Sequence, residues 1–123
     1  MLLNLAHKNL VVYCIALDLF EECNRLTKSF PNDEKYCLVS QIKRAALSVM
    51  LNIAEGSSRF SPIERKRFYE IARGSLVEID TAMVGANRLN YVSTSNLMKL
   101  CALLNSCFAM LSKLIKNLQS STC

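Results

Sequence analysis

Apolar residues recur at steps of three and four along most of this chain, the spacing that places side chains on one face of an α-helix. The first segment with this pattern covers residues 8–29 and ends before Pro31, because proline cannot continue the helical hydrogen bonds. The second covers residues 33–55 and ends at Gly56, where we predict the left-handed backbone conformation that closes many helices.

A third segment, residues 62–89, opens with Ser61-Pro62-Ile63-Glu64, which has the form of a capping box with proline at the first helical position. Asn90 follows this segment and suits the left-handed closing conformation. The fourth segment covers residues 94–119. Because the connections are short, sequential helices are expected to be antiparallel neighbours. We therefore predict an all-α fold, an up-down-up-down antiparallel four-helix bundle, in a single domain over residues 1–123.

The second segment is apolar on nearly its whole circumference. One set of residues forms an ordinary core face, and Leu47, Met50 and Leu51 cover much of the other side. A helix with this pattern is either central in a large core or covered by a second subunit. Four helices cannot bury one of their number completely, so we expect copies of the chain to cover it. The residues expected at the surface between copies are Leu47 and Leu51 of the second segment and Val77 and Val84 of the third.

Two further strips run along the second and third helices. The polar strip of the second helix consists of Gln41, Arg44, Ser48, Asn52 and Glu55. The strip of the third helix holds mostly small residues, Gly74, Glu78, Thr81 and Gly85. Interior glycine costs about 1 kcal/mol against alanine, so these glycines indicate close approach of another helix. The alternative is that they are tolerated imperfections.

The charge of the chain is unevenly distributed. The 123 residues hold 15 Lys and Arg against 10 Asp and Glu, a formal net charge of +5, which permits contact with nucleic acid without requiring it. Residues 40–73 hold seven bases and three acids, so +4 of the charge lies there. The candidate nucleic-acid-binding residues are Lys43, Arg59, Arg65, Lys66, Arg67 and Arg73.

The third helix begins with bases although the helix dipole favours acids at that end. This local cost is easier to understand if the bases meet phosphate, and Phe60 or Tyr69 is placed to stack on a nucleobase beside them. The alternative interpretation is an ordinary solvated face that Glu64 and Glu70 partly balance.

The six cysteines suggest a disulfide or zinc framework by number alone. They form no Cys-x-x-Cys pair, and the chain has one histidine, so we expect reduced thiols. Reduced thiols in turn predict a cytoplasmic protein. No segment reaches the length expected of a membrane span, and no membrane partner is expected. The cysteines expected to pack as small hydrophobic residues are Cys14, Cys23, Cys101 and Cys107.

The sequence carries no recognisable catalytic motif. Its histidine, His7, lies in the N-terminal segment, and its three glycines are isolated, which excludes a glycine-rich phosphate loop. A di-iron bundle needs Glu-x-x-His pairs, which the chain does not have. We therefore expect no enzymatic activity, catalytic residue, metal or cofactor. The alternative is a metal site built from the carboxylates of Glu55, Glu70, Glu78 and Asp80.

Specific motifs lie in the second and third segments. They are Ser40-Gln41-Ile42-Lys43-Arg44-Ala45-Ala46, Asn52-Ile53-Ala54-Glu55-Gly56 and Gly74-Ser75-x-x-Glu78. At this spacing they resemble the bacterial four-helix-bundle family encoded in 23S rRNA intervening sequences, over roughly residues 10–118. Arg65 departs from the pattern, since the family usually has an aromatic or apolar residue there.

The resemblance implies a homopentameric barrel of such bundles. It also implies kinship with the accessory variability proteins of diversity-generating retroelements, which bind nucleic acid and a reverse transcriptase, so a nucleic-acid-processing protein is an expected partner. We interpret the polar motif residues as a hydrogen-bonded network within or between subunits. The motif residues carried over by position to structure and assembly are Gln41, Arg44, Ser48, Asn52, Glu55, Gly56, Gly74, Ser75 and Glu78.

The leading hypothesis is a non-enzymatic homo-oligomer, a pentamer by resemblance, whose basic surface binds RNA or DNA weakly and with little sequence preference. The alternative is a protein-interaction scaffold in which the positive charge has no role in binding nucleic acid.

Overall fold

The structure describes residues 3, 5, 7 and 10–121. This part of the chain contains four α-helices joined by short connections, two of which include a 3₁₀ helix, and it contains no strand. In this computed structural model the α-helices are α1 (Val11–Thr27), α2 (Leu38–Ser57), α3 (Pro62–Arg88) and α4 (Met98–Ser121). The 3₁₀ helices are η2 (Asn32–Glu34) and η3 (Ser95–Leu97). The predicted all-α fold with four helices is confirmed.

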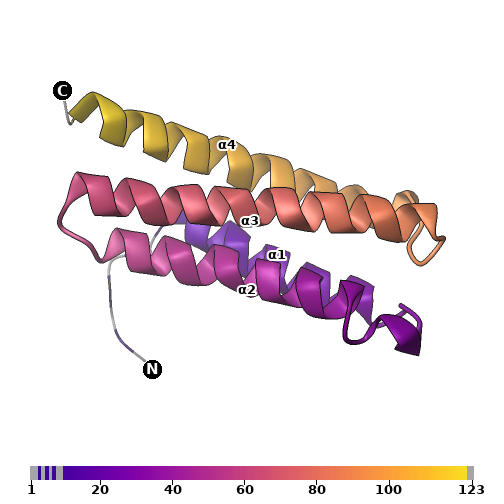
Figure 1. Cartoon of the computed structure of the whole chain (residues 1–123). Helices are drawn as coiled ribbons and strands as arrows, with labels where there is room; N and C mark the ends of the chain where they lie inside the picture. The colour runs from indigo at the N-terminus through magenta and orange to yellow at the C-terminus, as the bar shows by residue number, and fades with distance from the viewer. Residues whose placement is uncertain (1–2, 4, 6, 8–9, 122–123) are drawn as a thin grey trace.

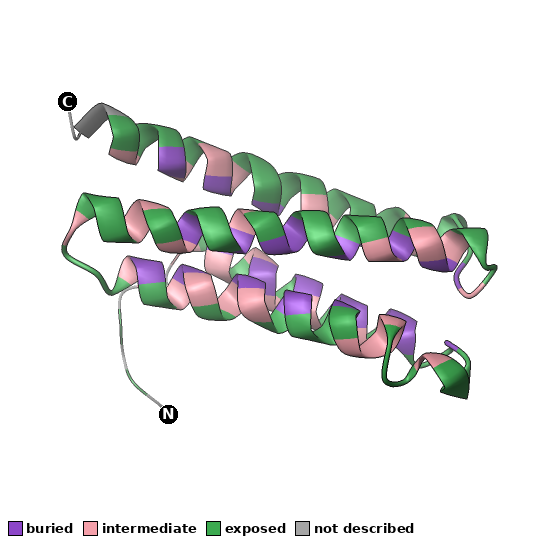
Figure 2. Cartoon of the chain, in the orientation of Figure 1, coloured by how far each residue is buried: buried purple, intermediate pink, exposed green. Residues whose placement is uncertain are grey.

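The helices lie side by side, and each packs against its neighbours in sequence, with α1 also packing against α4. Figure 1 shows the α2–α3 turn at one end of the bundle, together with the start of α1 and the end of α4. The α3–α4 connection and η2 lie at the other end. Buried side chains from all four helices form one core, and Figure 2 shows the buried residues as purple stretches along each helix.

Two helices begin later than predicted. α2 begins at Leu38 rather than at residue 33, because residues 32–34 form η2 and Cys37 leaves the helical region with φ −123° and ψ −98°. α4 begins at Met98, after η3. The predicted start of the first helix, at residue 8, lies outside the described residues.

The predicted N-cap, first residue and closing residue of α3 are confirmed. The Ser61 hydroxyl accepts a hydrogen bond from the backbone N–H of Glu64 at 3.4 Å, and Pro62 is the first helical residue. Asn90 has φ of 64°, the left-handed conformation expected after the helix. The limits of α3 therefore follow from hydrogen bonding and backbone conformation at residues next to its two ends.

The prediction for Gly56 was wrong. No described glycine has a positive φ, and α2 continues through Gly56 to Ser57. A Cβ atom at position 56 would lie 2.9 Å from Cε1 of Tyr69 and 3.1 Å from Cβ of Phe68. Glycine is needed here because α3 approaches the α2 backbone closely, and not because the backbone turns.

The cysteine prediction holds for two of the four core candidates. Cys23 and Cys107 are buried, and burial raises the pKa of both thiols to about 12. Cys14 and Cys101 are exposed. No disulfide joins the five described cysteines, and Cys123 lies outside the described residues.

Helix α4 is long, apolar and largely uncovered in the single chain. Ser95–Gln119 is long and apolar enough to cross a membrane by length and composition alone. An 18-residue window within it has a mean hydropathy of 1.4, and 22% of that window is buried in the bundle. The expectation that no segment reaches this length was therefore wrong. In the bundle this helix packs against α1 and α3, and much of its apolar surface remains uncovered.

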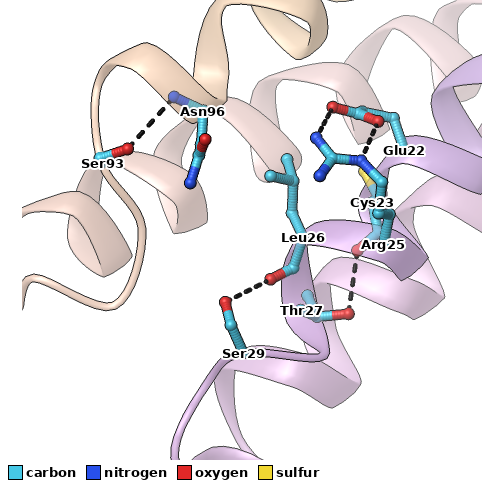
Figure 3. Close-up of polar contacts among 8 residues, drawn as sticks. All are labelled: Glu22, Cys23, Arg25, Leu26, Thr27, Ser29, Ser93 and Asn96. Atoms are coloured by element: carbon cyan, nitrogen blue, oxygen red, sulfur yellow. Dashed lines mark hydrogen bonds and ion pairs between the residues drawn. The ribbon is translucent and has the colours of Figure 1, made fainter.

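The C-terminal half of α1 contains a buried carboxylate. The Glu22 side chain is 2% exposed, and the Arg25 guanidinium donates from Nε to Oε1 at 2.8 Å and from Nη2 to Oε2 at 2.6 Å (Figure 3). These bonds hold the pKa of Glu22 below its usual range although burial opposes the shift, and the charge of Lys99 on α4 acts in the same direction as Arg25.

Replacing Arg25 with Met is expected to lower the free energy of unfolding near neutral pH, because the Glu22 carboxylate stays buried without its partner. The pKa of Glu22 is lower in the folded protein than in the unfolded chain. The pair therefore stabilises the protein at pH values above the pKa of the unfolded chain, and this stability is lost as the pH falls through the pKa of the folded protein. Urea unfolding near neutral pH and at ~pH 3 measures both effects. The difference between wild type and Arg25→Met should shrink at the lower pH.

The control for this prediction is Lys28→Met, which removes an exposed base at the end of the same helix. Its stability should stay within about 0.5 kcal/mol of wild type. Equal stabilities of the two variants near neutral pH would contradict the assigned role of Arg25.

Candidate nucleic-acid interface

Hydrogen bonds hold the turn between α2 and α3 on both sides. On the α2 side, the Ser57 hydroxyl lies 2.9 Å from the Tyr69 hydroxyl of α3. On the α3 side, Ser61 caps the helix. Arg59 and Phe60 lie between these two anchors, so both project from a turn whose path is fixed.

Arg59 makes two contacts that orient its guanidinium. Its Nη2 lies 3.0 Å from Oε2 of Glu55, and its guanidinium carbon is 5.1 Å from the centroid of the Phe68 ring. The Arg59 side chain remains 43% exposed. Exposed ion pairs of this kind add little stability, so the main effect is to orient the Arg59 guanidinium, whose charge Glu55 partly balances.

Three more bases follow in the first two turns of α3. Arg67 is exposed, whereas Arg65 and Lys66 are half-buried. The Nε atom of Arg65 is buried and has no hydrogen-bond partner among the described residues, so the inner part of this side chain is packed against the protein. We call Arg59, Arg65, Lys66 and Arg67 together the basic end.

The other two predicted bases lie elsewhere. Lys43 is near the start of α2, about 20 Å along the helix from the turn at 1.5 Å per residue. Arg73 contacts α4, where its Nη1 donates to the Ser112 hydroxyl at 3.1 Å and its guanidinium lies 5.7 Å from the Phe108 ring centroid. Four of the six candidates thus lie in or just after the α2–α3 turn, and two do not.

The two aromatic candidates have opposite environments. Tyr69 is 1% exposed and its hydroxyl is paired with Ser57, so the prediction that it is placed to stack on a nucleobase was wrong. Phe60 is fully exposed, at 101%. Tyr69 occupies a core position of α3, whereas Phe60 precedes the helix, and the sequence-based prediction did not use this difference.

Part of the predicted polar network forms within the chain. The Ser75 hydroxyl of α3 donates to the Ser48 hydroxyl of α2 at 2.9 Å, and Asn52 Nδ2 donates to the same hydroxyl at 3.0 Å. Arg44 and Glu78 are exposed, and neither forms an ion pair with a described residue. The network within one subunit therefore consists of the three buried or half-buried members, and the charged members face outward.

An open groove of about 540 Å³ runs between α3 and α4. Val77 and Val84, predicted on the uncovered side of α3, line it and are each 52% exposed. From α4, Phe108 and Met98 line the opposite wall, at 42% and 69% exposure. Sequence reasoning missed the α4 wall, because the apolar pattern of this helix was assigned to the core.

Two further predicted surfaces are open on the single chain. Leu47 and Leu51 on α2 are 40% and 51% exposed. A Cβ atom added at Gly74 or Gly85 would meet nothing within 4 Å. The space beside the small-residue strip is therefore unfilled by the chain itself.

The alternative chemistry gains no geometric support. Within residues 3, 5, 7 and 10–121, no group of three or more His, Cys, Asp or Glu side chains is arranged to hold a metal ion. The His7 ring packs edge-on against Tyr13, with centroids 4.8 Å apart. What the site offers is positive charge on a fixed turn and an exposed aromatic ring.

Comparison with known proteins is consistent with this fold. The family model described as 23S rRNA-intervening sequence protein matches residues 8–113, which include all of α1, α2 and α3 and most of α4. No curated protein gives a significant match. Because the family match covers most of the sequence, the chain belongs to the 23S rRNA-intervening sequence protein family.

Proposed function

We propose that this protein is a non-enzymatic homo-oligomer, a homopentameric barrel of up-down four-helix bundles, that binds RNA or DNA weakly through the basic end. The observation that supports nucleic-acid binding best is the placement of four bases in and just after one turn, where the acids Glu55, Glu64 and Glu70 balance them in part. Phosphate neutralisation by Lys and Arg supplies affinity that does not depend on sequence.

The exposed apolar surfaces support assembly. The α3–α4 groove and the outward face of α2 are unlike patches on one chain, and each leaves large apolar side chains in water. When one patch of a subunit contacts a different patch of the next, the contacts close into a ring if the rotation permits. Such a ring covers both surfaces in every subunit.

The charged motif residues fit the same proposal. Arg44 and Glu78 are outward-facing charges on adjacent helices. A second subunit laid over α2 and α3 would supply their partners, and the open space at Gly74 and Gly85 allows a close approach there.

Cellular setting and partners follow as further parts of the proposal. We propose a cytoplasmic protein with reduced thiols, related to the accessory variability proteins of diversity-generating retroelements and partnered by a nucleic-acid-processing protein. A protein-interaction scaffold without a nucleic-acid role is the competing function, and the α3–α4 groove favours it, since apolar grooves of this kind accept amphipathic helices.

Replacing Val84 with Glu is expected to dissociate the oligomer while the helices remain folded. The side chain is half-exposed in the single chain, but a carboxylate buried between subunits costs roughly 2 kcal/mol or more at each interface. Light scattering should give a multiple of 13.8 kDa for wild type and a mass near 13.8 kDa for Val84→Glu. Circular dichroism should show unchanged helix content.

Ser106→Glu adds the same charge at an exposed α4 position outside the groove and should assemble like wild type. A monomeric wild-type protein, or a Val84→Glu protein with wild-type mass, would refute assembly through this groove.

Changing Lys66 and Arg67 together to Glu is expected to weaken RNA binding at least about tenfold at low salt, because attraction to the phosphates becomes repulsion. The slope of log K against log salt should fall by about 1 for each phosphate that the variant no longer neutralises. Fluorescence anisotropy of a labelled RNA, titrated at several salt concentrations, measures both quantities.

The matched control changes Lys28 and Lys35 to Glu, which alters the net charge equally at exposed positions away from the α2–α3 turn. If wild type does not bind RNA even at low salt, or if both double variants show the same reduced affinity, the basic end is not the binding surface.

A further inference from the structure

Phe60 is the most exposed aromatic residue that the structure describes. Its side chain is 101% exposed, and it takes part in no ring contact or cation–π contact with another described residue. The next most exposed aromatic, Tyr36 at 86%, lies under the ammonium group of Lys35. A large apolar ring fully in water gives up the stabilisation that burial provides.

Hydrogen bonds flank the turn that carries this ring. On one side, the Ser57 and Tyr69 hydroxyls tie the end of α2 to α3, and on the other, Ser61 caps α3. An aromatic side chain on a fixed turn loses little freedom when a flat ligand stacks on it. The ring is therefore exposed on a turn that has hydrogen bonds at both ends.

Positive charge lies on both sides of the ring in sequence. Arg59 precedes Phe60 directly and is held in place by Glu55, and Lys66 and Arg67 follow in the first two turns of α3. Proteins that bind single-stranded nucleic acid combine these two elements, bases that follow the phosphates and aromatic rings on which nucleobases stack. In a duplex each nucleobase is already stacked between its neighbours, so an external ring cannot reach its face.

We propose that unpaired nucleic acid is the ligand of the basic end and that a nucleobase stacks on the Phe60 ring. This inference rests on the proposed nucleic-acid binding and names the form of nucleic acid bound. An anionic lipid surface is the less favoured ligand, because insertion of Phe60 and Ile63 would carry the exposed Glu64 carboxylate toward the apolar layer. Stacking leaves Glu64 in water.

The direct test uses Phe60→Trp, which introduces the only tryptophan of the chain. Titration with an unstructured oligouridylate should quench its fluorescence, because stacking brings a nucleobase onto the indole. An abasic strand of equal length and a fully paired RNA duplex should not quench it. Tyr36→Trp reports from the other end of the bundle and should respond to none of the three.

The affinity test uses Phe60→Leu, which keeps an apolar side chain and removes the ring. Its affinity for oligouridylate should fall about fivefold to a hundredfold, with the salt slope and the duplex affinity unchanged. Tyr36→Leu should bind oligouridylate like wild type. Because Phe60 is fully exposed, neither substitution at position 60 disturbs the core.

The outcomes separate this inference from the function on which it rests. If Phe60→Leu binds oligouridylate as tightly as wild type, or if Phe60→Trp responds equally to the abasic strand, stacking is refuted while nucleic-acid binding stands. If no RNA binds at low salt, both fail. If phosphatidylserine vesicles, and no RNA, shift the Phe60→Trp emission to the blue, the ligand is a lipid surface and both are refuted.

Discussion

The close contact between α2 and α3 fixes the positions of the other features. Gly56 admits the Tyr69 ring where no Cβ fits, and Ser48 and Ser75 bring their hydroxyls within 2.9 Å. Small residues at a helix contact allow the backbones to approach, and hydroxyls buried there must pair with each other. This contact therefore sets the geometry of the turn that carries the basic end. It also sets the direction in which the outward faces of α2 and α3 point.

The contrast with the α3–α4 contact explains why the chain has an uncovered surface. Gly56, Ser48 and Ser75 allow α3 to approach α2 closely, whereas a groove lies between α3 and α4. Arg73 bridges part of this gap through Ser112 and the Phe108 ring. Only 22% of the most apolar window of α4 is buried, so this helix leaves apolar surface in contact with water. Contact with another subunit or protein would cover that surface.

Sequence periodicity predicted the elements better than the contacts between them. Four helices, the Ser61 cap and the left-handed Asn90 followed from local chemistry, and each was found. Gly56 was misread because a glycine near a helix end fits two explanations, a left-handed stop and a close approach, and only the partner at Tyr69 decides between them. The late start of α2 depends on η2, which the hydrophobic pattern does not mark.

The candidate site was predictable in composition and not in arrangement. All six bases were identified from sequence, but nothing in the spacing shows that Arg73 turns toward α4 or that Lys43 lies about four turns away from the basic end. Phe60 and Tyr69 were both candidates for stacking, and tertiary packing made Tyr69 a core residue while Phe60, which precedes α3, stayed fully exposed.

Assembly and binding are physically coupled in the proposed oligomer. Rotation about an axis parallel to the helices preserves direction along that axis, so every α2–α3 turn of such a ring lies on the same rim. A chain with a net charge of +5 is a weak polyanion binder, but several basic ends on one rim sum their fields over a single strand. Each additional contact is then intramolecular, so avidity offsets the low affinity of one site. In the proposed ring, an exposed aromatic ring in every subunit would repeat along the rim and contact successive stretches of unpaired strand. The α3–α4 groove would then affect binding through assembly, without touching the nucleic acid.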